Sequence, residues 1–262
     1  MQRWLSLKIA DLHGIASNLE YLYPAELVWW LYRRQLGDVP QTNEFDVPTL
    51  TWRVLTQLEQ QGEFSVDGEL GRYLQSSDAR SRWQLARRLA QMYEQYLLYR
   101  PDWIIRWQRG SATDDWQANL WRKLTQAGGN RHWLTLQKRF FETLDTPANS
   151  NQLPSRLSLF ALPSVSPTYL QTIQRVAEKV DIFFYVLTPS PTYWSQIASE
   201  KETMRAVARD GADVTAYFDT GNTLLAGSGR QQREYFDLLL ELEGHSHECF
   251  TAPDETTLLG RI

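Results

Sequence analysis

Two short apolar segments with a helical segment between them constrain the fold of this chain most strongly. Residues 156–162 form one apolar run, ended by Pro163, and residues 180–187 form the other. The residues between them, 167–179, have the pattern of a helix. A strand, a helix and a second strand with short connections place the two strands parallel in one sheet. The sequence therefore predicts an α/β fold with a parallel sheet, and both strands are expected to be buried.

The first 144 residues carry helical patterns instead. The clearest helix spans residues 78–99, with apolar positions on one face at Leu85, Leu89, Met92 and Tyr96. Pro101 disfavours helical geometry in the residue before it, so this helix should end near Tyr99 and a new one should begin at the proline. The first 36 residues are expected to be helical, with a break near Gly14 and a second helix that starts at Pro24 and ends before Gly37. Other helices are expected near residues 48–58, 115–125, 132–144 and 230–242. The chain is thus predicted to be mostly helical, with a helical block over residues 40–148.

Two further segments give weaker patterns. Residues 199–221 are polar and predict no particular element. Residues 245–262 contain a possible strand and a turn.

Charge is distributed unevenly along the chain. The net charge is -4, yet residues 72–142 hold thirteen lysines and arginines against six acidic residues, a local net of +7, and the remainder carries -11. Six of the eleven tryptophans lie in the same window. Guanidinium groups and aromatic rings suit phosphates and bases, which favours a nucleic-acid ligand. The alternative is that these arginines form a solvated face and these tryptophans belong to the core.

Sequence motifs for catalysis are missing. No glycine-rich loop ends in Gly-Lys-Ser or Gly-Lys-Thr, and no strand is followed by the carboxylate and lysine pattern of a metal-dependent nuclease. Residues 227–230 offer at most an anion site at a helix start, and residues 200–202 are a weak nuclease candidate. His245, His247 and Cys249 would share one face of a strand and suit zinc or copper, although a polar turn is the simpler interpretation. We therefore predict no catalytic residue and no metal ligand.

Targeting features are also missing. No apolar run reaches the roughly 18 residues of a membrane span, and the N-terminus lacks the pattern of a secretory signal. The single cysteine, Cys249, fits a reducing compartment. A cytoplasmic location without membrane contact is expected.

Several segments, in the same order along the chain, resemble the RecC (exodeoxyribonuclease V gamma) family. The most specific is residues 93–103, Tyr-Glu-Gln-Tyr-Leu-Leu-Tyr-Arg-Pro-Asp-Trp, which is similar to the family's signature DQYLxYRPDW. Further similar segments are residues 116–121, 139–144, 153–156, 167–171, 193–194 and 221–226. Together they cover essentially the whole chain, which resembles the N-terminal helicase-like portion of the family.

The resemblance implies a fold and a set of partners. It implies a decayed superfamily 1 helicase-like domain, related to P-loop NTPases, with a 1A domain at residues 1–39 and 149–262 and a helical 1B insertion at residues 40–148. The family's first strand, its phosphate-loop position and its nuclease-like C-terminal domain are expected to be missing from this chain. RecB-like and RecD-like subunits and single-stranded or forked DNA are the implied partners.

The resemblance also implies a function without catalysis in this chain. RecC subunits of exodeoxyribonuclease V split the duplex and scan the 3'-ended strand for the Chi sequence. No cofactor is expected here, because the partner subunits would use ATP and Mg²⁺. The alternative is a protein-interaction scaffold for the partner subunits that binds little DNA by itself.

Seven positions match the Chi-scanning surface of the family: Arg3, Tyr23, Trp29, Gln91, Met92, Glu94 and Arg100. Trp29 would be a stacking platform and Arg100 a donor to phosphates or base edges. Glu94 and Gln91 would be acceptors or donors to base edges. Arg3, Tyr23 and Gln91 depart from the residue usual in the family, which puts recognition of the usual Chi octamer in doubt. The structural alternatives are that Trp29 belongs to the core and that Arg100 caps helix carbonyls.

Overall fold

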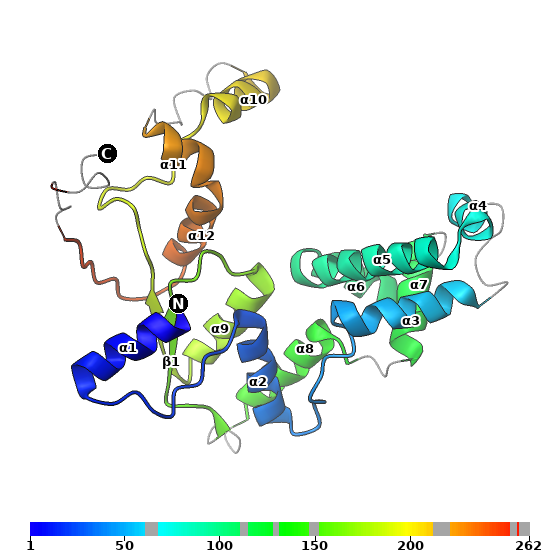
Figure 1. Ribbon diagram of the computed structural model, residues 1–262, viewed down its shortest axis with the longest axis horizontal. Coiled ribbons are helices and arrows are strands. Elements are labelled where there is room, and N and C mark those ends of the chain that lie inside the picture. The colour runs from blue at the N-terminus through cyan, green and yellow to red at the C-terminus, as the bar shows by residue number, and fades with distance from the viewer. Residues whose placement is uncertain are drawn as a thin grey trace. The chain divides into compact units, whose positions relative to one another are not determined.

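The computed structural model describes residues 1–60, 68–110, 115–127, 131–146, 152–211, 221–251 and 256 (Figure 1). The elements are α1 (Gln2–His13), α2 (Pro24–Leu36), α3 (Val47–Glu59), α4 (Glu69–Ser76), α5 (Ala79–Tyr99), α6 (Pro101–Gln108), α7 (Trp116–Ala127), α8 (Trp133–Leu144), β1 (Arg156–Phe160), α9 (Pro167–Ala177), β2 (Asp181–Tyr185), α10 (Glu200–Asp210), α11 (Thr223–Ser228) and α12 (Arg230–Leu240). Among the described helices, none is long and apolar enough to cross a membrane.

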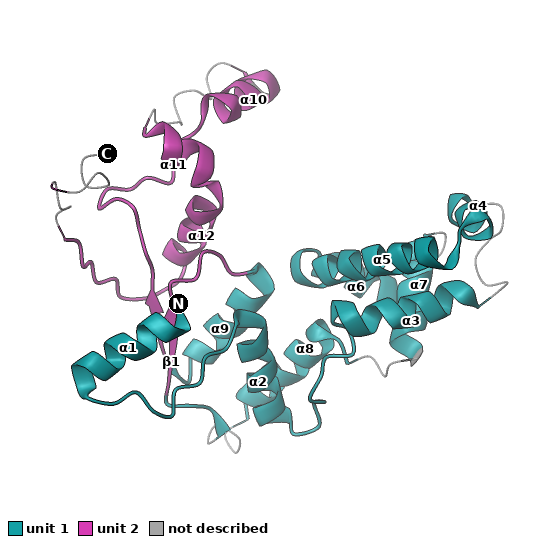
Figure 2. Cartoon of the chain, in the orientation of Figure 1, with its two compact units in different colours: residues 1–155, 166–181 teal, residues 156–165, 182–262 magenta. Residues whose placement is uncertain are grey.

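Two compact units make up the chain (Figure 2). Unit 1 contains residues 1–155 and 166–181, and unit 2 contains residues 156–165 and 182–262. The predicted helical block of residues 40–148 lies within unit 1, and its boundaries as a domain stay a prediction.

The prediction of a mostly helical α/β chain with parallel strands is confirmed, since β1 and β2 pair as a parallel sheet. The expectation that both strands are buried is wrong. Only Leu159 of β1 is buried, and β2 alternates between exposed and half-buried residues, with Phe183 and Tyr185 exposed. A strand is buried on both faces only where other layers cover both faces, and in the described part of the chain this sheet has two strands.

Helix α5 begins and ends as the sequence predicts. Asp78 caps it, its Oδ1 accepting from the Ser81 amide at 2.7 Å, and the chain leaves helical geometry at Arg100, directly before Pro101. The predicted core face is rotated, however. The buried stripe is Ala86, Leu89, Ala90, Tyr93 and Leu97, while Leu85, Met92 and Tyr96 are half-buried. Two of these five residues are alanines, whose small side chains permit close approach, and α5 packs against α3.

Unit 1 has an aromatic core. Trp121 of α7 is fully buried and lies 5.3 Å from the ring of Tyr93 on α5 and 5.5 Å from the ring of Phe45 before α3. His132, which precedes α8, completes the cluster at 5.4 Å from Trp121. Rings from four segments therefore meet at one point, which fixes the helices of the block around it.

A buried polar network joins α2, α8, α9 and α5. The hydroxyl groups of Tyr32 and Thr172 lie 3.1 Å apart, and the Gln137 amide donates to the Thr172 hydroxyl at 3.0 Å and to the Thr168 carbonyl at 3.1 Å. The Thr168 hydroxyl in turn donates to the Leu98 carbonyl at 2.7 Å. Because every one of these atoms has a partner, the network can be buried without a large desolvation penalty, and it places the end of α5 on α9.

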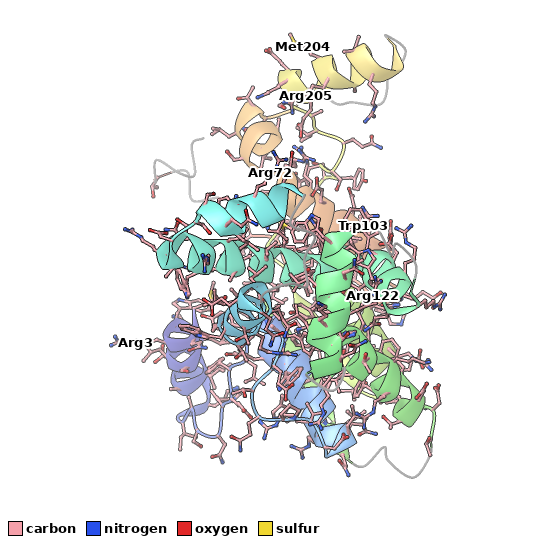
Figure 3. All side chains as sticks on the ribbon, turned by 90° about the vertical axis from the view of Figure 1, so that its right-hand side faces the viewer. Arg3, Arg72, Trp103, Arg122, Met204 and Arg205 are labelled. Carbon is pink, nitrogen blue, oxygen red and sulfur yellow. The ribbon has the colours of Figure 1, made fainter. Side chains whose placement is uncertain are left out.

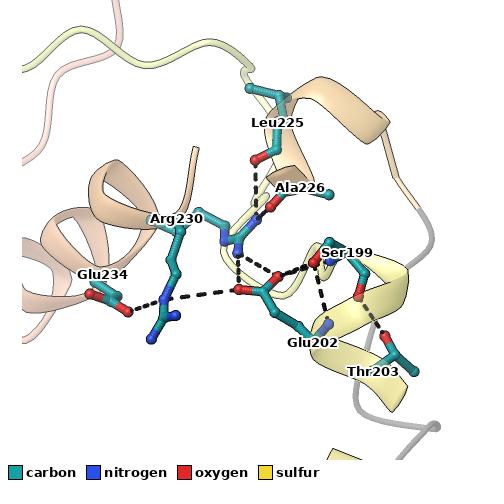
Figure 4. Close-up of polar contacts among 8 residues, drawn as sticks. Ser199, Glu202, Thr203, Leu225, Ala226, Arg230 and Glu234 are labelled. Carbon is teal, nitrogen blue, oxygen red and sulfur yellow. Dashed lines mark hydrogen bonds and ion pairs between the residues drawn. The ribbon is translucent and has the colours of Figure 1, made fainter. Parts of the chain in front are cut away.

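Glu202 lies among several polar contacts of unit 2 (Figure 4), and it forms an ion pair with Arg233 at 3.3 Å. Arg233 of α12 is buried and donates to the carbonyls of Leu225 and Ala226 at 3.1 and 3.0 Å, at the end of α11. Glu202 caps α10, accepting from the Ser199 amide at 2.9 Å. One guanidinium therefore holds three helices together.

The sequence predictions missed several elements here and in unit 1. Helix α10 lies in the polar segment without a predicted element, although Ser199 and Glu202 have the spacing of a capping box. Helices α4 and α11 are also outside the predicted set. The possible strand after residue 245 is wrong for residues 245–251, which have no regular structure. That segment is polar and entirely exposed, so no apolar face holds it against a sheet.

Candidate nucleic-acid interface

The junction of α5 and α6 exposes a cluster of charged and aromatic side chains, which we call the α5–α6 corner. It consists of Tyr99, Arg100, Asp102, Trp103 and Arg106. Pro101 creates this corner, because it ends α5 and starts α6 with only Arg100 between the two helices. The Trp103 amide donates to the Arg100 carbonyl at 3.0 Å, which closes the turn.

Arg100 contacts two other side chains of the corner, Asp102 and Trp103. Its Nε and Nη2 donate to Oδ1 and Oδ2 of Asp102, both at 3.1 Å, and its guanidinium lies 4.0 Å from the centre of the Trp103 ring. Arg106 approaches the same carboxylate at 3.6 Å. The hydrogen bonds between the two side chains lower the pKa of Asp102 and raise the pKa of Arg100. Both groups are therefore charged at neutral pH. Two arginines sharing one aspartate leave a net positive charge at the surface.

The capping role considered for Arg100 is not what its contacts show. Its side-chain hydrogen bonds go to Asp102, in the first turn of α6. The guanidinium is 46% exposed, so a ligand in solvent can reach it.

Glu94 lies on α5, six residues before Arg100, and is half-buried. Burial raises its pKa, with a smaller contribution from the charge of Asp46. The charge of Glu94 also contributes, after burial, to the raised pKa of Tyr169 on α9.

Trp29 connects to this region through its ring contacts rather than through an exposed face. Its ring centre lies 5.1 Å from that of Trp133, which lies 5.2 Å from that of Tyr169. Trp29 is only 8% exposed, and its Nε1 donates to the Pro40 carbonyl at 3.1 Å. A buried ring offers no face to a base, so the structure favours the core role over the stacking role.

The remaining predicted positions lie in three places. Gln91 is exposed and Met92 half-buried on α5, on the helix that also carries Glu94. Tyr23 is exposed directly before α2, and its amide donates to Glu26 at 2.8 Å. Arg3 lies on α1, which buries none of its side chains, and Figure 3 shows Arg3 apart from Trp103 of the corner. The structure therefore groups four of the predicted residues along α5 and its end: Gln91, Met92, Glu94 and Arg100.

The basic window of residues 72–142 divides into two groups of side chains. Most of its cations are exposed: Arg72, Arg80, Arg87, Arg88, Arg100, Arg106, Arg109, Arg131 and Lys138. Arg122 instead donates to the Trp107 carbonyl at 3.0 Å, and Arg139 pairs with Asp38 at 2.8 Å. The six tryptophans of the window also fall into two groups. Three are buried (Trp107, Trp121 and Trp133), and three are half-buried (Trp83, Trp103 and Trp116). The exposed cations of the window therefore form a positive surface, whereas half of its tryptophans belong to the core.

Asp102, Trp103 and Arg106 were outside the predicted set. The signal for them was present in the sequence, because a proline followed by an acidic residue begins a helix and brings the next residues beside the preceding helix end. The side-chain rotamer that places the Arg100 guanidinium over the Trp103 ring could not be predicted from the sequence.

The weaker candidates have structural roles where they are described. The Glu202 carboxylate accepts a hydrogen bond from the Ser199 amide and forms an ion pair with Arg233. Arg230 pairs with Glu234 at 2.8 Å. The Gly229 amide donates to the Leu225 carbonyl at 2.9 Å. His245, His247 and Cys249 are exposed in an irregular segment, so the strand that would have aligned them is missing there.

Comparison with known proteins gives a consistent result. The chain matches the family described as RecC, N-terminal domain, over residues 1–262. It is 31% identical over 277 residues to the RecBCD enzyme subunit RecC of Escherichia coli, covering 93% of this chain and 25% of that protein. It is 27% identical to the subunit of the same name from Haemophilus influenzae, covering 100% of this chain and 29% of that protein. The chain therefore spans about a quarter of the length of these relatives.

Proposed function

The chain belongs to the RecC N-terminal domain family, and from this membership we propose that it is part of a DNA-handling subunit of a RecBCD-type complex. Such a complex would process double-strand breaks for homologous recombination. This chain would help to split the duplex and to scan the 3'-ended strand for Chi. It would have no active site of its own, and RecB-like and RecD-like partners would use ATP and Mg²⁺.

The observation that carries the proposal is the exposed guanidinium of Arg100 over the ring of Trp103 at 4.0 Å. A stacked, charged guanidinium suits the oxygens of phosphate and the acceptor atoms of base edges. The exposed arginines of the basic window would add attraction to the backbone that does not depend on sequence.

Binding of a fluorescent single-stranded oligonucleotide, measured by anisotropy over a salt series, tests the proposal. The control for Arg100→Ala is Arg34→Ala, because Arg34 is also exposed and lies over a tryptophan, 5.0 Å from the centre of the Trp30 ring. We expect wild-type binding that weakens steeply with salt, and we expect Arg100→Ala to reduce the salt slope by about one. Arg34→Ala should leave binding nearly unchanged. No binding at low salt, or an equal loss in both variants, would contradict the proposal.

The scaffold alternative has one specific observation in its favour. Helix α1 exposes Leu7 and Leu12, and none of its residues is buried. Exposed apolar side chains on a helix that buries no residue are typical of a surface that contacts another protein. If this alternative is right, Leu7→Ser and Leu12→Ser weaken binding to a purified RecB-like subunit, while Arg100→Ala has no effect on any ligand.

A further inference from the structure

We infer that Asp102 is a positioning residue for Arg100, holding the guanidinium so that one of its edges faces a ligand with two acceptor atoms. The inference rests on the function proposed above and specifies how the α5–α6 corner would hold DNA. The ligand atoms would be two oxygens of a phosphate or the paired acceptors of a base edge.

The hydrogen-bond donors of Arg100 show which edge of the guanidinium Asp102 binds and which edge is left for a ligand. A guanidinium carries five N–H groups, and Nε and Nη2 each direct one toward Asp102, at 3.1 Å. One hydrogen of Nη1 and the second hydrogen of Nη2 point the same way, away from Asp102, and form the outer edge of the fork. This edge can bind two acceptor atoms of a phosphate or a base in a bidentate manner.

Three neighbours restrict the guanidinium and its partner. Asp102 fixes one edge, and the Trp103 ring, 4.0 Å away, restricts the orientation of the guanidinium. Arg106 approaches Asp102 at 3.6 Å and restrains the carboxylate in turn. All three charged side chains are exposed, and exposed ion pairs contribute little to folding stability. The arrangement therefore matters for the geometry of Arg100 more than for the fold.

Positioning and simple charge make opposite predictions for Asp102→Asn. The substitution removes a negative charge, so on charge alone it strengthens binding of an anionic ligand. It also removes one of the two oxygens that hold Arg100, so Arg100 must be ordered when the ligand binds. Ordering a long side chain on binding corresponds to about a two- to tenfold loss of affinity.

The experiment compares the dissociation constants of the full chain for a fluorescent single-stranded oligonucleotide. The variants are Asp102→Asn, Arg100→Ala and the double variant, with Glu142→Gln as the control. Glu142 is exposed and pairs with Lys138 at 4.0 Å, so its substitution makes the same change of charge away from the corner. A second oligonucleotide with abasic sites separates phosphate from base contacts.

We expect Asp102→Asn to weaken binding about two- to tenfold, Glu142→Gln to leave it equal or slightly tighter, and the double variant to match Arg100→Ala. A loss that persists on the abasic oligonucleotide assigns the outer edge to phosphate, and a loss confined to the oligonucleotide with bases assigns it to a base edge. Equal or tighter binding by Asp102→Asn, or a loss that adds to that of Arg100→Ala, overturns the inference while the proposed function stands. If Arg100→Ala binds like the wild type, the proposed function fails with it.

Discussion

The hydroxyl group of Thr168 donates a hydrogen bond of 2.7 Å to the carbonyl oxygen of Leu98. The bond joins the first turn of α9 to the last turn of α5, two residues before Arg100. Carbonyl groups in the last turn of a helix have no partner within it, so this side chain satisfies one of them. The position of the α5–α6 corner thus depends on a residue seventy positions later in the chain.

Replacing Thr168 by valine should destabilise unit 1 by about 1–3 kcal/mol, because the nearly isosteric side chain leaves the Leu98 carbonyl without its donor. Thr168 is buried, whereas Thr56 on α3 is exposed and donates within its own helix, to the Trp52 carbonyl. Thr56→Val should therefore change the free energy of unfolding by less than about 0.5 kcal/mol. Urea denaturation followed by circular dichroism measures both values, and equal effects would show that the bond between α9 and α5 is unimportant.

The ends of a helix depend on neighbouring residues and could be predicted from the sequence, whereas the burial of a side chain depends on residues far away in the chain. Pro101 and Asp78 act on their immediate neighbours, and both ends of α5 were predictable from them. Which face of α5 is buried depends on α3, so the spacing of large apolar residues alone gave the wrong stripe. Trp29 matched a functional pattern, yet its burial is decided by Trp133, a residue more than a hundred positions away.

The pH dependence of stability should carry a contribution from His132. Burial lowers the pKa of His132 to about 3, whereas an unfolded histidine titrates near 6.5. Between these values the unfolded chain binds the extra proton, so stability falls as the pH drops from about 6.5 toward about 3. Within that window the wild type should lose up to about 1.4 kcal/mol per pH unit relative to His132→Gln.

Unfolding free energies of both proteins between pH 7 and pH 4 test this, with His13→Gln as the control because His13 is exposed. If wild type and His132→Gln keep a constant difference across that range, His132 is not buried in its neutral form.

Arg233→Met should loosen unit 2 by about 2–4 kcal/mol, because it removes the donor to the Leu225 and Ala226 carbonyls and leaves Glu202 without its buried partner. Arg230 also faces Glu202, at 3.9 Å, but is exposed, so Arg230→Met should have a much smaller effect. Hydrogen exchange of the amides in α10 to α12 measures the difference. Similar exchange rates in the two variants would be inconsistent with the central role given to Arg233.

Trp29→Phe should separate stability from DNA binding. The smaller ring loses the hydrogen bond to the Pro40 carbonyl and part of the contact with Trp133, so we expect destabilisation by about 1–3 kcal/mol. Under conditions where the variant is fully folded, its affinity for single-stranded DNA should equal that of the wild type. A loss of affinity without a loss of stability would restore Trp29 as a stacking residue.

Hydrogen exchange of the wild-type chain, with and without a saturating single-stranded oligonucleotide, tests the central claim most directly, because it locates the DNA without any substitution. We predict that the oligonucleotide slows exchange in peptides that cover residues 96–109, the end of α5 and the whole of α6, and leaves α10 to α12 unchanged. Protection confined to other segments, with residues 96–109 unaffected while the oligonucleotide is bound, would contradict the claim that the α5–α6 corner is a DNA-binding surface.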